Sequence, residues 1–166
     1  MNKKLFFLIA IIFFFYTITE ITEELNIFYP LTNWLLTILF GLALFSADYP
    51  RISLTCYLLF ILSFLFYRNP VEDNFNFDFY LWDWLKLARK NRIVFINIFG
   101  NLLLFAPLPF YIRGKYSLLI IIALVLVLEL MQYITKRGVF DIVDIFLNIV
   151  GISLGFVLRR LYGKQR

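Results

Sequence analysis

The chain has 166 residues, of which 62% are hydrophobic and only 16% charged, with a formal net charge of +5. About a quarter of the residues are charged in an ordinary globular protein, so this composition excludes a typical water-soluble domain and indicates an integral membrane protein. The basic residues lie in short clusters between apolar blocks, a pattern that describes membrane topology and not a nucleic-acid-binding surface. Histidine is absent and cysteine occurs once, which excludes intrachain disulfides, ordinary zinc sites and Ser-His-Asp triads.

Six apolar blocks predict about six membrane-spanning helices, because each approaches the ~20 residues that cross a bilayer. They fall at residues 5–19, 31–47, 52–67, 93–112, 116–135 and 139–158. The first and third are short for a span. The first block also resembles a secretory signal peptide, but no small-residue cleavage site follows it, which favours a retained span. The predicted fold is an all-α, polytopic membrane helical bundle, formed by residues 1–166 as a single membrane domain.

Lysine and arginine set the orientation of such a bundle, because they are enriched in cytoplasmic segments. With six spans and a cytoplasmic amino terminus, nine of the 16 Lys and Arg residues fall on the inner side and seven on the outer side. The bias is modest, but both basic chain ends agree with it. We therefore expect both termini to be cytoplasmic.

The longest connection, residues 68–92, separates the third and fourth blocks. Its aromatic and apolar residues alternate with charged ones, as expected of an amphipathic segment in the membrane interface. Anchoring at the headgroups is the simpler role for its Trp and Tyr residues. A lid over a substrate is the alternative.

Pro107 and Pro109 interrupt the inner half of the fourth block. Proline lacks an N–H and clashes with the preceding helical turn. The pair therefore predicts either a kink in this span or its inner end. A kink would splay the helix and help to open a cavity above it.

Polar residues recur at regular intervals in the last block. At about 100° per residue, Asp141, Asp144, Asn148, Gly151 and Gly155 share one helix face. Gly151 and Gly155 form a GxxxG pair, a spacing that lets another helix approach closely. This face is therefore expected to meet the rest of the bundle.

The two preceding blocks carry polar residues at the same kind of spacing, namely Asn97, Asn101, Glu129 and Gln132. At ~1.5 Å per residue these four residues, Asp144 and Asn148 all lie roughly 5 to 14 Å below the outer ends of their helices. An acidic side chain facing lipid at mid-span costs about 2.5–3.5 kcal/mol. We therefore predict that the polar side chains meet in one inward-facing layer, with Arg137 and Asp141 at its outer mouth.

Two interpretations of this layer stay open. The first is an interhelical hydrogen-bond clamp, in which asparagines donate to the carboxylates. The second is a functional pocket, which ionisable residues inside a membrane favour. In a pocket, Glu129 or Asp144 is a candidate general acid or base, and Glu129, Asp141 and Asp144 are the candidate ligands for a hard cation such as Mg²⁺. No cofactor is otherwise expected.

Residues 91–156 resemble the VanZ-like family of small bacterial membrane proteins. The matching positions are Asn97, Asn101, Leu104, Phe105 and Pro107, then Glu129 and Gln132, then Arg137, Asp141, Asp144, Asn148, Gly151 and Gly155. Pro109 departs from the family pattern, which often has glycine there, and Arg137 lies about one residue further from Asp141 than the family pattern has it. The resemblance implies a cell-envelope protein of the bacterial cytoplasmic membrane, with a link to teicoplanin resistance in the protein that gives the family its name. It assigns no reaction.

Three functional hypotheses follow. The favoured one is a pocket in the outer leaflet that recognises or modifies a lipid-linked or surface envelope molecule, including a glycopeptide-related ligand. Its candidate ligand-binding residues are Asn97, Asn101, Gln132, Arg137, Asp141 and Asn148. The second is a carboxylate- or Mg²⁺-dependent enzyme acting on an envelope lipid, and the third, less favoured, is transport. Membrane lipids are the expected partners, nucleic acid is not, and the sequence does not predict an oligomeric state.

Overall fold

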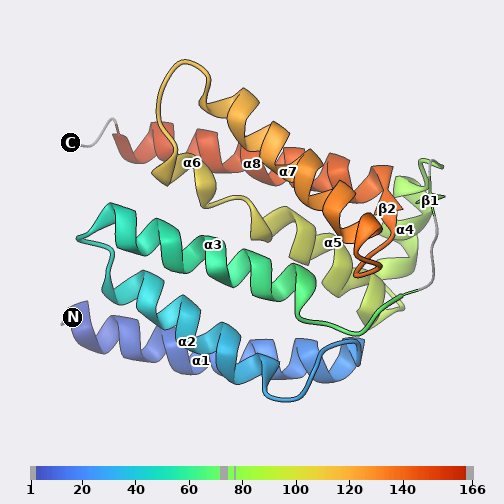
Figure 1. Ribbon diagram of the computed structural model, residues 1–166, viewed down its shortest axis with the longest axis horizontal. Helices are drawn as coiled ribbons and strands as arrows, with labels where there is room; N and C mark the ends of the chain where they lie inside the picture. Colours follow the sequence, from blue (N-terminus) through green and yellow to red (C-terminus); the bar gives the residue numbers. More distant parts are fainter. Residues whose placement is uncertain (1–2, 72–74, 77, 164–166) are drawn as a thin grey trace. The chain divides into compact units, whose positions relative to one another are not determined.

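The computed structural model describes residues 3–71, 75–76 and 78–163 (Figure 1). Residues 72–74 and 77 of the predicted interfacial segment lie outside this description. The chain forms two compact units, one within residues 1–69 and one within residues 70–166. Helices build both units, which confirms the all-α helical prediction. That they act as a single membrane domain stays a prediction.

Three helices form the first unit: α1 (Lys3–Leu25), α2 (Thr32–Phe45) and α3 (Pro50–Phe66). Pro50 stands at the start of α3, where a proline's missing N–H costs no helical hydrogen bond. α2 contacts both neighbours. The rings of Phe14 and Phe40 stack between α1 and α2 with centroids 4.0 Å apart. Asn33 Nδ2 of α2 donates to Thr19 Oγ1 of α1 at 3.0 Å, so a polar contact also joins these helices.

The first two helices differ in length from the predicted blocks. α1 runs on to Leu25 through three glutamates, because glutamate favours a helix although it disfavours the bilayer core. α2 has only 14 residues, or ~21 Å, less than the ~30 Å hydrocarbon core. Within the described residues, four segments are long and apolar enough to cross a membrane, namely Leu5–Leu25, Arg92–Tyr111, Ser117–Ile134 and Ile142–Leu161. α2 and α3 are shorter apolar helices, so the count of six spans stays a prediction.

The second unit contains α4 (Leu81–Ala88), α5 (Arg92–Leu104), α6 (Leu108–Tyr111), α7 (Ser117–Ile134) and α8 (Ile142–Gly163). Two short parallel strands, β1 (Phe75–Asn76) and β2 (Phe140–Asp141), pair at one end of it. In Figure 1, α5 and α7 run alongside α8, and contacts join α8 to α5, α6 and α7. α8 is therefore the helix around which this unit packs.

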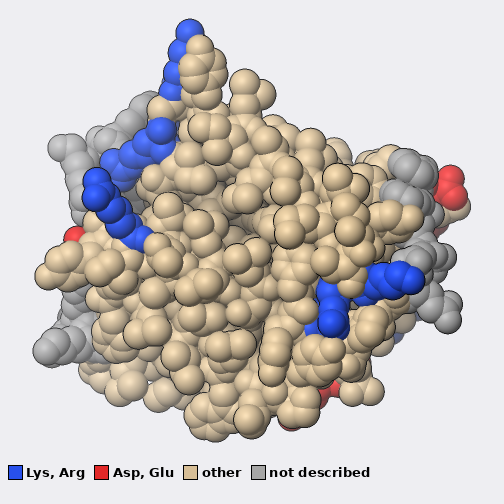
Figure 2. Space-filling view, viewed as in Figure 1, with Lys and Arg blue, Asp and Glu red and all other residues tan. Residues whose placement is uncertain are grey.

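The long helices bury one face and expose apolar side chains on the other. α7 buries a stripe at helical spacing, made of Ser117, Ile121, Val125, Leu128, Glu129 and Gln132. Large apolar side chains stand out from other faces, among them Phe13 at 71% and Ile134 at 66% exposure. Figure 2 shows Lys and Arg side chains toward the ends of one molecular face, with a broad uncharged surface between them. Apolar exposure on this scale marks a surface that contacts lipid, and the chain is a multi-pass membrane protein.

The fourth predicted span, residues 93–112, is broken into α5 and α6. Pro107 and Pro109 cannot donate backbone hydrogen bonds, and the chain turns between the two helices with Leu108 N bonded to Phe105 O at 3.1 Å. Arg159 of α8 supplies hydrogen bonds to carbonyl oxygens near this break. Its Nη1 donates to Pro109 O at 2.6 Å and to Ile112 O at 3.3 Å. A cation from the carboxyl end of α8 thus satisfies carbonyl oxygens at the end of α6.

Two glycines set the distance between α8 and the broken span. A Cβ added at Gly151 would overlap the carbonyl oxygen of Leu102, and one added at Gly155 would overlap that of Ala106. Both clashes are with backbone atoms, which cannot rotate away as the end of a side chain can. The backbones of α8 and α5 therefore meet directly, as small residues allow in membrane helices.

Replacing either interface glycine should destabilise the protein. Gly151→Ala and Gly155→Ala force the helices apart, and overpacking of this kind costs about 1–3 kcal/mol or more. Gly100→Ala is the matched control, because nothing lies within 4 Å of its added Cβ. Thermal unfolding of the purified proteins in one detergent measures the effect. Equal melting temperatures for all three variants would contradict the close approach.

Removing the Arg159 guanidinium should also lower stability. Arg159→Met keeps the length of the side chain but leaves the carbonyls of Pro109 and Ile112 without this donor. The expected loss is about 1–3 kcal/mol of unfolding free energy. Arg160→Met is the control, because Arg160 is exposed and one residue further along α8. The same loss in both variants would rule out the proposed role of Arg159.

Candidate functional site

α8 presents polar side chains to its neighbours from its first turns. Asp144 lies in the first turn, where the helix dipole favours a negative charge. Asn101, on α5, donates from Nδ2 to Asp144 Oδ1 at 2.6 Å. A hydrogen bond to an ionised carboxylate is shorter and stronger than one between neutral groups. The structure thus brings together one predicted asparagine and one predicted carboxylate from different helices.

A second pair joins α8 to α7 one turn further along α8. Asn148 Nδ2 donates to Glu129 Oε1 at 3.1 Å. Both side chains are buried, with 0% of Asn148 and 6% of Glu129 exposed. Glu129 belongs to the buried stripe of α7, so its carboxylate points into the protein and not toward lipid. Burying a polar group without a hydrogen-bond partner costs free energy. The donation from Asn148 spares the Glu129 side chain that cost.

The other half of the Asn148 amide is unsatisfied. Its Oδ1 atom is buried and accepts no hydrogen bond from the part of the chain that the structure describes. The nitrogen of the amide faces Glu129 Oε1, so the oxygen of the amide points away from this contact. Buried polar atoms with no partner are rare in folded proteins. Asn148 therefore offers an acceptor inside the protein to a group that can donate.

Asp141 lies at the end of β2, directly before the first residue of α8. Its Oδ1 accepts from Val143 N at 2.7 Å, as a helix-capping carboxylate does, and its Oδ2 accepts from Asn76 Nδ2 at 2.8 Å. The β1–β2 pairing, with Asn76 opposite Asp141, holds this contact in register. Sequence reasoning missed Asn76, because no short-range pattern links residues 65 positions apart.

Three other predicted residues lie around these pairs. Gln132 is buried on α7, and its backbone carbonyl oxygen accepts a hydrogen bond from Arg137 N at 2.8 Å. Lys136, between them, takes the left-handed conformation with φ 57°, which turns the chain from α7 toward β2. Arg137 is half-buried at this turn. In the described part of the chain, Asn97 is half-buried one turn before Asn101 and makes none of the hydrogen bonds above.

The three acidic residues proposed as cation ligands do not gather. Among the described residues, no group of three or more His, Cys, Asp or Glu side chains lies close enough to hold a metal ion. Asp141, Asp144 and Glu129 each accept from a different asparagine instead. A hard cation needs several oxygens converging on one point, so a Mg²⁺ site at these residues stays a prediction.

Two serine hydroxyls, one on α7 and one on α8, donate to nearby backbone carbonyls. Ser153 Oγ donates to Ile149 O at 2.8 Å, and Ser117 Oγ donates to Gly114 O at 2.9 Å. Such local bonds are usual for serine in apolar helices. Each serine hydroxyl thus donates to a backbone carbonyl of its own segment.

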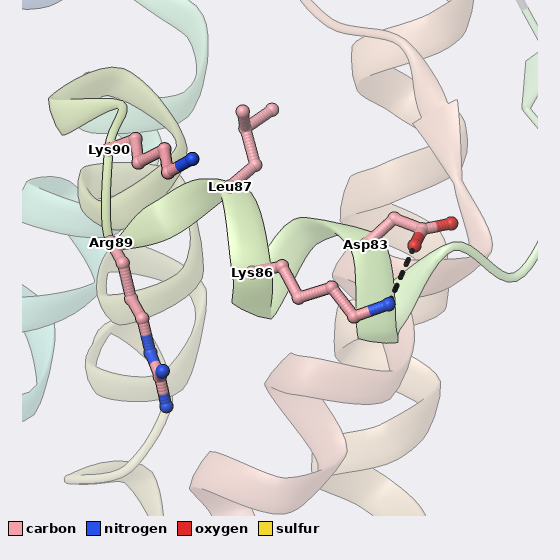
Figure 3. Close-up of a pocket in the computed structure, with 5 residues that line it drawn as sticks. All are labelled: Asp83, Lys86, Leu87, Arg89 and Lys90. Carbon is pink, nitrogen blue, oxygen red and sulfur yellow. Dashed lines mark ion pairs between the residues drawn. The ribbon is translucent and has the colours of Figure 1, made fainter.

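The predicted interfacial segment contains α4, and its charged side chains line a depression of about 480 Å³ (Figure 3). The lining residues are Asp83, Lys86, Leu87, Arg89 and Lys90. Just before α4, Tyr80 Oη donates to Asp78 Oδ2 at 2.7 Å. This hydrogen bond and the Asp78 charge raise the pKa of the Tyr80 phenol above its ordinary value. The phenol is therefore a neutral donor at physiological pH.

The comparisons agree with the resemblance drawn from the polar residues. The family described as VanZ/LLP1 matches residues 53–163, about two thirds of the chain. The match extends beyond the predicted region 91–156, to most of α3 and to the α4 segment. Searches of curated proteins and of solved structures each gave no match. The chain belongs to the VanZ-like family.

Proposed function

We propose that this VanZ-like membrane protein is a cell-envelope receptor, in which the polar side chains of α5, α7 and α8 recognise the headgroup of a lipid-linked or surface envelope molecule. The proposal places the protein in the bacterial cytoplasmic membrane, with both termini cytoplasmic and these side chains near the outer surface. The resemblance to the VanZ-like family suggests one kind of ligand, a glycopeptide-related molecule, and with it a link to teicoplanin resistance.

The buried Oδ1 atom of Asn148, which has no hydrogen-bond partner among the described residues, is the observation that carries the proposal. A headgroup hydroxyl or amide N–H supplies the donor that this acceptor lacks. Asn148 is fully buried, so a ligand gains a hydrogen bond there without competition from bulk water. Donation from the same amide to Glu129 fixes its orientation before the ligand arrives.

The other predicted residues have complementary roles in this proposal. Arg137, half-buried at the turn between α7 and β2, is suited to hold a phosphate or carboxylate as a two-pronged donor. Gln132, Asn97 and Asn101 orient hydroxyl or amide groups. Recognition is preferred to catalysis because Glu129 and Asp144 each accept a hydrogen bond from an asparagine.

A structural clamp is the second candidate, and the direct pairing of carboxylates with asparagines favours it. Interhelical hydrogen bonds in membranes contribute about 0.6–2 kcal/mol each. The pairs Asn101–Asp144 and Asn148–Glu129 hold α5 and α7 to the same face of α8. The two candidates differ in what a variant loses: a clamp variant loses stability, whereas a receptor variant loses its ligand.

Asn148→Ala should lose a bound lipid while keeping its fold. Removing the buried acceptor costs about 1–3 kcal/mol of binding, or roughly 5- to 150-fold in affinity. Mass spectrometry of lipids that co-purify with the full chain in a mild detergent measures this, and teicoplanin susceptibility of the expressing cells is a second readout. Asn33→Ala is the matched control, because Asn33 also bonds across helices but lies in the first unit. An unchanged lipid profile in Asn148→Ala, with a lower melting temperature, would favour the clamp.

A double-mutant cycle on Asn101 and Asp144 should give a positive coupling energy. Asn101→Ala, Asp144→Ala and the double variant together isolate the 2.6 Å hydrogen bond, whose coupling we expect to be about 0.6–2 kcal/mol. Thermal or denaturant unfolding in detergent measures each free energy. Additive losses would show that the two side chains act independently and would contradict this pairing.

The variant Asp144→Asn tests for catalysis instead. A lipid species that accumulates in cells expressing this variant would indicate that the protein turns over that lipid.

A further inference from the structure

α4 turns its most apolar face toward the protein and its charged face outward. Leu81, Trp84 and Ala88, at helical spacing, pack against a buried cluster of Ile98, Val143 and Leu147. The helix is therefore fixed to α5 and α8 by its own apolar face. This packing leaves the opposite face of α4 free for another partner.

The outward face combines a tryptophan with cations. At about 100° per residue, Arg89, Trp82 and Lys86 fall within about 60° of one another on the helix. The Trp82 side chain is 74% exposed, the most exposed tryptophan of the chain. Figure 3 shows Arg89 and Lys90 leaving the carboxyl end of α4 in different directions, and Lys86 reaching toward Asp83. These residues border the depression of about 480 Å³.

The depression carries a net positive charge, since three of its lining residues are basic and one is acidic. Asp83 lies 3.6 Å from Lys86 Nζ, but the two side chains are 74% and 79% exposed. An ion pair that exposed to solvent is weak. An incoming anion can therefore displace it at little cost and engage Lys86 together with Arg89 and Lys90.

We propose that this face of α4 binds the phosphate of an anionic phospholipid. The guanidinium of Arg89 matches a phosphate as a two-pronged donor, and the lysines add positive charge. Trp82, beside them, has the amphipathic ring that favours the boundary between headgroups and acyl chains. Exposed Phe79 and Leu85 give the same end of the unit further apolar contact. A lipid satisfies both the charged and the apolar groups, whereas a soluble anion satisfies only the first.

The site is separate from the α5–α7–α8 polar layer and does not depend on the proposed receptor function. Each basic residue near an anionic membrane surface strengthens binding by about fivefold. Neutralising three of them should therefore remove most of the preference for anionic lipid. Salt should weaken the preference too, because exposed charges are screened.

Tryptophan quenching by brominated lipids tests the proposal. The full chain carrying Trp34→Phe, which leaves Trp82 and Trp84 of α4 as reporters, is reconstituted into mixed phosphatidylcholine–phosphatidylglycerol vesicles. Bromine is placed on one lipid or on the other at equal mole fraction. We expect stronger quenching by brominated phosphatidylglycerol, and loss of that difference in the triple variant Lys86→Gln, Arg89→Gln, Lys90→Gln. The pair Lys86→Arg and Lys90→Arg should retain it.

A second triple variant controls for overall charge. Arg113→Gln, Lys115→Gln and Arg160→Gln remove the same number of positive charges from exposed positions elsewhere in the unit, and should keep the preference. Asn148→Ala should keep it as well, so failure of the receptor proposal is distinguishable from failure of this one. Equal quenching by both lipids in the parent protein would overturn the proposal. Equal loss in both triple variants, or displacement of the lipid by inorganic phosphate alone, would also overturn it.

Discussion

A carboxylate inside an apolar helical unit needs a hydrogen-bond donor, and in this protein an asparagine of another segment supplies each one. Asn101 donates to Asp144, Asn148 to Glu129, and Asn76 to Asp141. These bonds tie α5, α7 and β1 to α8 or to the strand before it. Side chains as short as asparagine and aspartate reach one another only between closely packed segments. The second unit must therefore pack closely for these hydrogen bonds to form.

Close packing in turn depends on backbone features that carry no charge. Gly151 and Gly155 let α8 touch the carbonyl groups of Leu102 and Ala106. The break that the prolines make after α5 leaves carbonyls to be satisfied, and Arg159 donates to two of them. The glycine contacts, the proline break and the hydrogen bonds from Arg159 therefore meet one face of α8, further toward its carboxyl end than the asparagine–carboxylate pairs.

Much of this arrangement was predictable from the sequence, because helical spacing and the cost of burying charge both act locally. The shared face of Asp144, Asn148 and the glycines follows from periodicity alone. The bounds of α1 and α2 differ from those of the predicted apolar blocks, because hydropathy marks where lipid is tolerated and not where a helix ends. Asn76 and Arg159 were missed, since their partners are far away in the sequence. The outward charged face of α4 also needed the structure, which shows that its apolar side is already covered.

The central claim is that side chains of α5 and α8 meet inside the membrane-spanning unit. Disulfide formation between Asn101→Cys and Asp144→Cys, in a Cys56→Ser chain oxidised in native membranes, measures it most directly. Peptide mass spectrometry should find the 101–144 disulfide at high yield, and little for a control that pairs Asp144→Cys with Phe99→Cys on the exposed side of α5. Comparable yields for both pairs, or none for 101–144, would contradict the account.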